Sequence, residues 1–398
     1  MNKLSYVLVT PYTIAKSRTG GVIARLLSRT DLELVGAQMI APDEDFVNQY
    51  AASLRGSKQK NLNSGAKLLA DYVEKNMGPS GGRRHRSLLL LFRGEDPVSK
   101  LSDICGALFP ENRSVESMTG ETIRDTYADL ILDQEDPGRI MYFEPAVLTP
   151  RSQSLADENL ALFARRLRAC RNMVDNMIYP EPSRIEKTLV MIKPDNWSFA
   201  SSRPGTIIDM FSRTGLRIIG IKIFRFSLNE ALDFYGPVEQ QLLEKLAPVF
   251  GRKARNLLER EFNIPLPAEA EKGLTDSFGV EYAREQFRQI INFMSGKRPD
   301  TCPENERNKP GDVKCMILVY EGEDAVKKIR AVLGPTDPLK APGGTVRREF
   351  GSNVMVNTAH ASDSAASYER EKAIVRIDEN NVREIIEEYL YGKTGKTA

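Results

Sequence analysis

The sequence has few of the features that mark membrane, disulfide-rich or metal-binding proteins. Its apolar runs, among them residues 88–92, are far shorter than the ~20 residues that cross a bilayer, so we expect no membrane span. An N-terminal apolar run stops at Pro11, short of the ~7–15 residues of a signal-peptide core, and is predicted to be a first strand. The 4 cysteines form no C-x-x-C pair and only 2 histidines occur, which favours a cytoplasmic protein with reduced thiols and without a zinc centre.

The chain also lacks an excess of charge of either sign. Lysine plus arginine (56) against aspartate plus glutamate (54) leaves +2 over 398 residues. No global field therefore attracts nucleic acid or anionic lipid, and an anionic partner must be held by a local site. The basic loop at residues 81–86 has no interleaved aromatic side chains, so we interpret it as a solvated loop instead of a nucleic-acid patch.

One internal repeat organises the sequence. A strand, loop, helix and strand pattern at residues 6–39 returns at residues 188–223, and two further matches follow in the same order. They pair residues 91–98 with 319–326 and residues 120–124 with 343–347. Short β-branched runs alternate with helical patterns, which predicts an α+β fold in which helices cover a small sheet.

The repeat predicts four segments in chain order. These are a first domain at residues 1–150, a helical linker at 151–185, a second domain at 186–385 and a tail at 386–398.

The linker is predicted to be one long amphipathic helix. Ser154 can cap it, and an apolar stripe at spacings of four and three continues until the prolines at 180 and 182. Such a stripe packs on the protein's own domains or binds a partner, and the first interpretation is favoured. The stripe consists of Phe163, Leu167, Cys170, Val174 and Met177.

The second repeat holds a set of residues that the first lacks. Lys193 follows a strand, and cations, hydroxyls, an amide, one imidazole and a carboxylate come later. Taken singly, these residues are surface charges, a turn and a structural histidine; together they suggest phosphoryl transfer. That chemistry needs neutralised phosphate oxygens and a nucleophile, which neutral imidazole supplies near pH 7. The set is Lys193, Arg330, Thr336, Arg347, Asn357, His360, Ser362 and Glu371.

Two segments carry a family resemblance. Residues 188–195, Thr-Leu-Val-Met-Ile-Lys-Pro-Asp, and residues 357–364, Asn-Thr-Ala-His-Ala-Ser-Asp-Ser, resemble the two signature segments of nucleoside diphosphate kinases. The resemblance extends over residues 186–227, 281–300 and 315–375 and is weak in the first half. It implies two tandem ferredoxin-like α/β sandwich domains with small antiparallel sheets, the first degenerate and the second intact.

The resemblance also implies an activity. His360 takes the γ-phosphoryl group of a nucleoside triphosphate and passes it to a nucleoside diphosphate in a ping-pong mechanism, with Mg²⁺ held by the nucleotide phosphates and not by the protein. Ser362 and Glu371 align with residues that brace the histidine. The resemblance further implies a homo-oligomer, but the family's usual hexamer cannot be assumed for this chain. The residues implied to contact phosphate or ribose are Lys193, Tyr235, Arg330, Thr336, Arg347 and Asn357.

The base-binding region departs from the family. Ile290 falls at the apolar position of the base clamp, but Gln286 stands where the family has an aromatic ring and Phe287 is its neighbour. An insertion of about residues 236–284 precedes this segment, and an extended loop at residues 301–314 follows it. We therefore expect altered nucleotide entry or oligomer packing.

The first repeat is predicted to have lost the chemistry. Thr10 stands at the lysine position, Ser102 at the first arginine position and Phe143-Glu144 near the histidine position, while Arg124 persists. Without lysine or nucleophile this domain is expected to buttress the second in place of a dimer neighbour.

Three functions remain open at this point. The first is an active kinase, and the second is a nucleotide-binding regulatory or scaffold protein with little turnover. The third, a nucleic-acid-binding protein, rests only on the basic loop and on analogy.

Overall fold

The computed structural model describes residues 2–56, 64–109, 120–136, 140–168, 170–174 and 177–392. The chain divides into two compact units. Unit 1 comprises Met1–Ile223, Met316–Glu369 and Arg376–Ala398, and unit 2 comprises Phe224–Cys315 and Arg370–Val375. Of the described residues, none belongs to a helix long and apolar enough to cross a membrane.

The first sheet of unit 1 has the strand order β2-β3-β1-β6. Strand β1 runs antiparallel to β3 and β6, and β2 runs antiparallel to β3. Almost every residue of β1 and β3 is buried, as expected of apolar strands covered on both faces. The bounds are β1 Lys3–Val9, β2 Glu33–Ile40, β3 Ser87–Gly94 and β6 Val147–Leu148.

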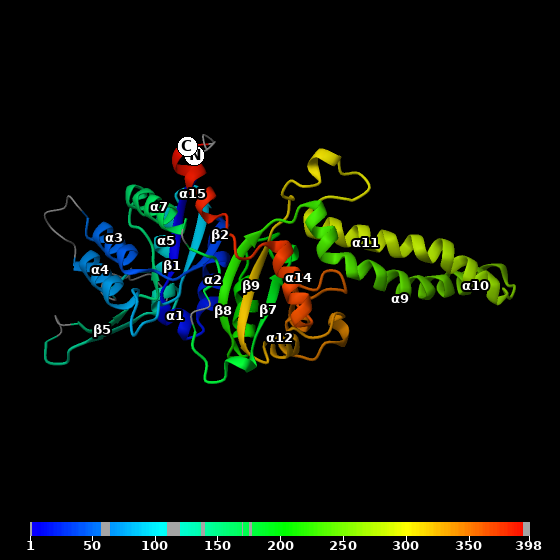
Figure 1. Ribbon diagram of the computed structural model, residues 1–398, viewed down its shortest axis with the longest axis horizontal. Helices are drawn as coiled ribbons and strands as arrows, with labels where there is room; N and C mark the ends of the chain where they lie inside the picture. Colours follow the sequence, from blue (N-terminus) through cyan, green and yellow to red (C-terminus); the bar gives the residue numbers. More distant parts are fainter. Residues whose placement is uncertain are drawn as a thin grey trace. The chain divides into compact units, whose positions relative to one another are not determined.

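Seven helices and a small hairpin accompany this sheet in the described residues (Figure 1, blue to green). The hairpin pairs β4 (Asp129–Leu132) with β5 (Ile140–Glu144) and forms a separate two-stranded sheet. The helices are α1 Pro11–Ala15, α2 Thr19–Ser28, α3 Glu44–Arg55, α4 Ser64–Asn76, α5 Pro97–Cys105, α6 Ile123–Tyr127 and α7 Gln153–Leu167.

The second sheet has the same strand order as the first. Its order is β10-β7-β9-β8, so β7, β8, β9 and β10 correspond to β1, β2, β3 and β6. The predicted α+β class, with helices covering small antiparallel sheets, is confirmed. The strands are β7 Ile185–Ile192, β8 Arg217–Phe224, β9 Cys315–Glu323 and β10 Ala359–Ala361, and the α-helices of unit 1 that lie between them along the chain are α8 Arg203–Ser212, α12 Ala325–Leu333 and α13 Val346–Phe350.

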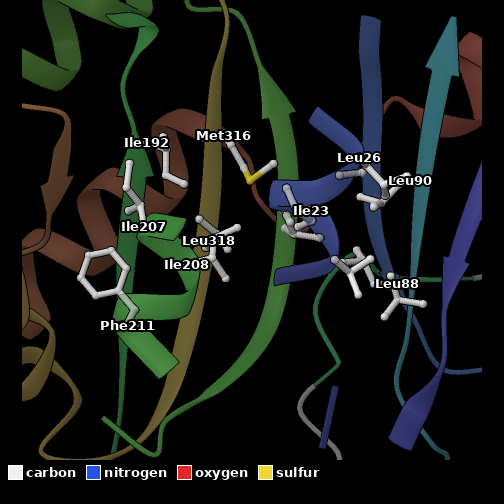
Figure 2. Close-up of a cluster of buried hydrophobic side chains, with 14 of the residues drawn as sticks. Ile23, Leu26, Leu88, Leu90, Ile192, Ile207, Ile208, Phe211, Met316 and Leu318 are labelled. Carbon is white, nitrogen blue, oxygen red and sulfur yellow. The ribbon is translucent and has the colours of Figure 1, made fainter. Parts of the chain in front are cut away.

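The two sheets share one compact unit because α2 of the first repeat packs against α8 of the second. The helices cross at two glycines: a Cβ on Gly20 would lie 2.5 Å from the Gly205 oxygen, and a Cβ on Gly205 would lie 2.1 Å from the Ala24 nitrogen. Glycine therefore permits a backbone approach that no other residue allows. Figure 2 shows Ile23 of α2 and Ile208 of α8 in one buried cluster. The structure thus groups into one unit what the sequence divides at residues 150–185.

The linker differs from the predicted long helix. Helix α7 is capped by Ser152, which accepts from the Leu155 N–H at 3.2 Å, and not by Ser154. The helix ends at Leu167: the Cys170 N–H donates to the Leu167 oxygen at 3.2 Å in a turn, and the Val174 N–H donates to the Ile219 oxygen at 2.8 Å. Phe163 is buried and its ring meets Tyr6 at 4.8 Å, so α7 packs on the first sheet of its own chain.

The predicted tail contains a helix. Helix α15 (Val382–Tyr391) begins before residue 386, and it packs on α7 and β2. Val382 and Ile386, four residues apart, are fully buried, and the Tyr389 hydroxyl donates to Asp157 at 3.0 Å. Residues 393–398 of the predicted tail lie outside the described part of the chain.

Unit 2 contains the predicted insertion, residues 236–284, and is helical. Helix α9 packs along α11, with the rings of Phe250 and Tyr282 stacked at 3.7 Å. The segment predicted as a loop at residues 301–314 contains one turn of 3₁₀ helix, Glu304–Glu306. The helices are α9 Leu228–Phe262, α10 Ala268–Leu274, a π-helical turn Thr275–Gly279 and α11 Val280–Ser295; α14 (Ala365–Val375) is shared between the units.

Candidate active site

The site in unit 1 is built where β7 ends beside the short strand β10. Lys193 directly follows β7, and its backbone N–H donates to the Thr358 oxygen at 2.9 Å. Thr358 has a positive φ of 74°, which turns the chain into β10 just before His360. The Lys193 ammonium donates to Asn357 Oδ1 at 2.7 Å. Two residues that are 164 positions apart are thereby joined at one edge of the sheet.

Burial makes Lys193 an unusual lysine. Its side chain is 8% exposed, and its pKa is lowered from 10.5 to about 7. Burial is the largest cause, the positive charge of Arg347 adds to the lowering, and Asp195 opposes it. Lys193 therefore lies close enough to Arg347 for the two cations to repel, an arrangement that an anion between them would relieve.

Asn357 connects the lysine to the loop that carries Thr336. Its amide nitrogen donates to the Thr336 backbone oxygen at 3.2 Å and to the Val354 oxygen at 2.7 Å. With Oδ1 accepting from Lys193, both ends of the amide are used and its orientation is fixed. The Thr336 side chain is exposed.

Arg347 holds the strand of the histidine. One terminal nitrogen donates to the Gly334 oxygen, at the C-terminal end of α12, and the other donates to the Ala359 oxygen, each at 3.0 Å. Ala359 is the residue before His360. Arg347 therefore ties β10 to α12 in addition to facing Lys193.

His360 lies in the centre of β10, opposite Met191 of β7 and half-buried. Arg330, exposed on α12, and His360 both act on Asp363: the pKa of Asp363 is lowered mainly by the Ser367 hydroxyl, and the charges of Arg330 and His360 lower it further. Ser362 is fully buried, and its backbone N–H donates to the Leu189 oxygen at 3.0 Å. The structure thus brings the predicted cations and the histidine to one edge of the second sheet.

Sequence reasoning missed the residues that support this edge. The Asn196 amide donates to the Thr358 oxygen at 2.8 Å, and Arg203 lies 3.9 Å from Asp195. Burial raises the pKa of Asp195, and Lys193 and Arg203 oppose that shift. Asp195 is the last residue of the signature segment 188–195, so the sequence did offer a signal for it. No local sequence pattern marks Arg203.

Unit 2 carries the remaining predicted residues. Tyr235, on α9, is buried with its ring 5.1 Å from that of Phe234. On α11, Phe287 is 5% exposed and faces the helical core, whereas Gln286 and Ile290 are half-buried. A buried ring is not available to stack on a nucleotide base, so the geometry does not favour Phe287 in that role. Glu371, in the part of α14 that belongs to unit 2, is buried with Arg370 at 3.6 Å.

The first repeat allows a position-by-position comparison. Leu8 pairs with Leu148 as Met191 pairs with His360, so the histidine position is Leu148 and not Phe143-Glu144. The sequence count failed because the β4–β5 hairpin, which the second sheet lacks in the described residues, shifts the register. Ser102 does stand at the position of Arg330: each accepts the cap N–H of the glycine four residues on.

A carboxylate takes the place of the Lys193–Asn357 pair in the first repeat. Glu144 accepts from the Thr10 hydroxyl at 2.7 Å and from the Ala146 N–H at 3.0 Å, and Tyr72 also donates to it. Burial raises the pKa of Glu144, and these hydrogen bonds oppose the shift. Arg124 donates to the Gly106 and Val147 oxygens, as Arg347 does to Gly334 and Ala359. The persistent arginine is therefore explained by its structural contacts.

The donor set suits phosphate better than a bare metal ion. Cations, hydroxyls, an amide and an imidazole line this edge, and within the described ranges no three His, Cys, Asp or Glu side chains gather as a metal site. A divalent cation prefers oxygen ligands such as carboxylates. The fold and the site together define an α+β protein suited to a phosphorylated ligand.

Comparison with known proteins identifies the family. The nucleoside diphosphate kinase family model matches residues 306–380. A nucleoside diphosphate kinase of Pyrobaculum aerophilum is 30% identical over 197 residues, which cover 47% of this chain and 92% of the relative. One from Hyperthermus butylicus is 30% identical over 198 residues, covering 50% of this chain and 96% of the relative. The chain belongs to the nucleoside diphosphate kinase family.

Solved structures of the family also align with about half of the chain. An NDP kinase from Pyrobaculum aerophilum is 29% identical, with 48% of this chain and 94% of that chain covered and a TM-score of 0.33. The Aquifex aeolicus enzyme is 26% identical, with 48% and 94% covered and a TM-score of 0.30.

Proposed function

We propose that the protein transfers the γ-phosphoryl group of a nucleoside triphosphate to a nucleoside diphosphate through a phosphohistidine at His360. The observation that carries the proposal is the linked set at the edge of the second sheet. Lys193 bonds Asn357, Asn357 bonds the Thr336 backbone, and Arg347 holds the residue before His360. Membership of the nucleoside diphosphate kinase family supports the same reaction.

The first half-reaction forms a bond between an imidazole nitrogen and the γ-phosphorus. The bond from that phosphorus to the bridging oxygen breaks, and the nucleoside diphosphate leaves with the electron pair. Lys193, Arg330 and Arg347 neutralise the phosphate oxygens during transfer. In the second half-reaction a terminal oxygen of another nucleoside diphosphate attacks the same phosphorus and frees the histidine. Ser362 and Glu371 are proposed to brace the imidazole.

The metal in this proposal enters with the nucleotide. Mg²⁺ on the phosphates would neutralise charge that the protein's cations leave uncompensated. The ribose and base contacts are proposed for Tyr235, Gln286 and Ile290 of unit 2. A cytoplasmic location and a homo-oligomer stay predictions.

A nucleotide-binding regulator with little turnover is the second candidate. It is the weaker one because a decayed site loses its chemistry, as the first repeat has done by placing Leu148 at the histidine position. The second repeat keeps lysine, arginines, asparagine and histidine together.

Steady-state transfer separates the two candidates. The full chain is mixed with ATP, Mg²⁺ and a second nucleoside diphosphate, and the new triphosphate is measured by chromatography. The kinase predicts parallel double-reciprocal lines, loss of transfer in His360→Ala and full transfer in His85→Ala, which removes the chain's other histidine. Nucleotide binding with no transfer in the wild-type protein would support the regulator and contradict the kinase.

A further inference from the structure

A cavity lies in unit 1 between the two repeats, and the proposed reaction does not use it. It encloses about 340 Å³. Ile14 and Thr19 of the first repeat line one side, and Ile208, Leu216 and Tyr320 of the second repeat line the other. None of the residues proposed for phosphoryl transfer is among those that line it.

Two arginines give the cavity a positive wall. Arg86 donates to the Ile218 oxygen, and its pKa is lowered by burial and then by the nearby charge of Arg217. Arg217 lies over the Tyr179 ring at 5.1 Å. Among the described residues that line the cavity, none is Asp or Glu. The carboxylate that acts on Arg86 is Glu321, which is engaged by Tyr179 at 2.9 Å and by Lys187 at 3.6 Å.

The first turn of α2 adds to this positive field. Thr19 and Gly20, the first residues of a ten-residue helix, line the cavity. The N-cap residue Arg18 supplies no side-chain cap bond in the described structure. Uncapped N–H groups and the helix dipole favour an anion at this end.

Buried polar atoms at the same wall lack partners. The Tyr320 hydroxyl and one terminal nitrogen of Arg217 are buried and have no hydrogen-bond partner among the described residues. Tyr320 is 1% exposed. Such groups are unfavourable when they stay unsatisfied, so a ligand that can accept hydrogen bonds from them is favoured.

We propose that this cavity binds a phosphate monoester with a small apolar body. Two guanidinium groups and a helix N-terminus match the two charges of a phosphate monoester, whereas a carboxylate would leave one cation uncompensated. Ile14, Ile208 and Leu216 supply apolar surface for the rest of the ligand. Because both repeats line the cavity, the bound ligand stabilises their packing and raises the unfolding temperature.

Calorimetric titration of the full chain with phenyl phosphate tests this site without relying on the proposed reaction. Arg217→Ala removes a cavity cation, and Ser212→Phe fills the cavity while leaving both arginines. Arg213→Ala is the matched control, because Arg213 is exposed at the C-terminal end of α8, next to Ser212, and does not line the cavity. We expect saturable binding to the wild-type protein, about tenfold or more weaker in the first two variants and unchanged in the control.

Inorganic phosphate and benzoate separate the parts of the ligand. Both should bind more weakly than phenyl phosphate, and phenyl phosphate alone should raise the unfolding temperature clearly. Equal affinity for inorganic phosphate would overturn the apolar part of the proposal. Absence of saturable binding, or equal affinities of Arg217→Ala and Arg213→Ala, would overturn the site. If Arg217→Ala does not fold, a folded Ser212→Phe that binds as the wild-type protein does would overturn it as well.

Discussion

Nucleotide binding should be accompanied by proton uptake at pH 8, and Lys193 is the group that takes up the proton. Burial and the charge of Arg347 lower its pKa to about 7 in the ligand-free protein. At pH 8 a lysine with that pKa is about one-tenth protonated. A bound phosphate favours the charged form, which raises the pKa toward its ordinary range. Binding should therefore take up about 0.9 proton per site.

The sign of the linkage gives two further consequences. Because protons are taken up, nucleotide affinity should fall as the pH rises from 7 toward 10. In the ligand-free protein the folded pKa of Lys193 lies below the unfolded value of 10.5. Its contribution to stability is therefore present above that value and is lost as the pH falls through about 7.

Calorimetry at pH 8 in buffers of different ionisation enthalpy measures the uptake. The nucleotide phosphate is already ionised there, since its last pKa is about 6. Lys193→Met should abolish the uptake and weaken binding, whereas Lys327→Met, an exposed lysine on α12, should behave as the wild-type protein does. The proton uptake is the slope of the observed binding enthalpy against the ionisation enthalpy of the buffer. A slope near zero in the wild-type protein, or the same slope in Lys193→Met, would refute the assignment to Lys193.

Three further predictions concern the repeats and the base. Arg124→Ala and Arg347→Ala each strand two carbonyls, so each should lower the free energy of unfolding by about 2–4 kcal/mol in urea titrations. Only Arg347→Ala should also lose nucleotide transfer, and equal transfer in both would contradict the site. Gln286→Phe should tighten purine nucleotide binding about 5- to 150-fold, and unchanged affinity in a titration would show that the helix register is wrong. Gly20→Ala should cost about 1–3 kcal/mol or more of unfolding free energy, because its Cβ meets backbone at 2.5 Å. Gly343→Ala, with open space around it, should change stability by less than about 0.5 kcal/mol, and similar losses in the two variants would argue against the close helix crossing.

The repeat and the equivalence of Arg124 with Arg347 could be predicted because local patterns carry them. Gly-Glu-Asp motifs and the Thr-Ile-Arg and Thr-Val-Arg segments survive in both copies. The histidine position of the first repeat could not be predicted, because the β4–β5 hairpin intervenes and Leu148 has no neighbours that match the second copy.

Long-range hydrogen bonds explain the other differences. The apolar stripe of the linker continues past Leu167 with helical spacing, but helix α7 ends at Leu167. The Val174 N–H donates to the Ile219 oxygen of β8 and not to a helical carbonyl. Spacing alone carries no information about a partner 45 residues away along the sequence. The same holds for Arg203, whose contacts with Asp195 and Phe350 form only in the fold.

The position of the labelled phosphate tests the central claim most directly. The full chain is incubated with γ-labelled ATP and Mg²⁺, quenched in alkali and digested, and the labelled peptide is sequenced. The account predicts one acid-labile, alkali-stable phosphate per chain on His360, discharged on addition of a nucleoside diphosphate, with none in His360→Ala and full labelling in His85→Ala. Label on any other residue, or unlabelled wild-type protein that still transfers phosphate between nucleotides, would contradict it.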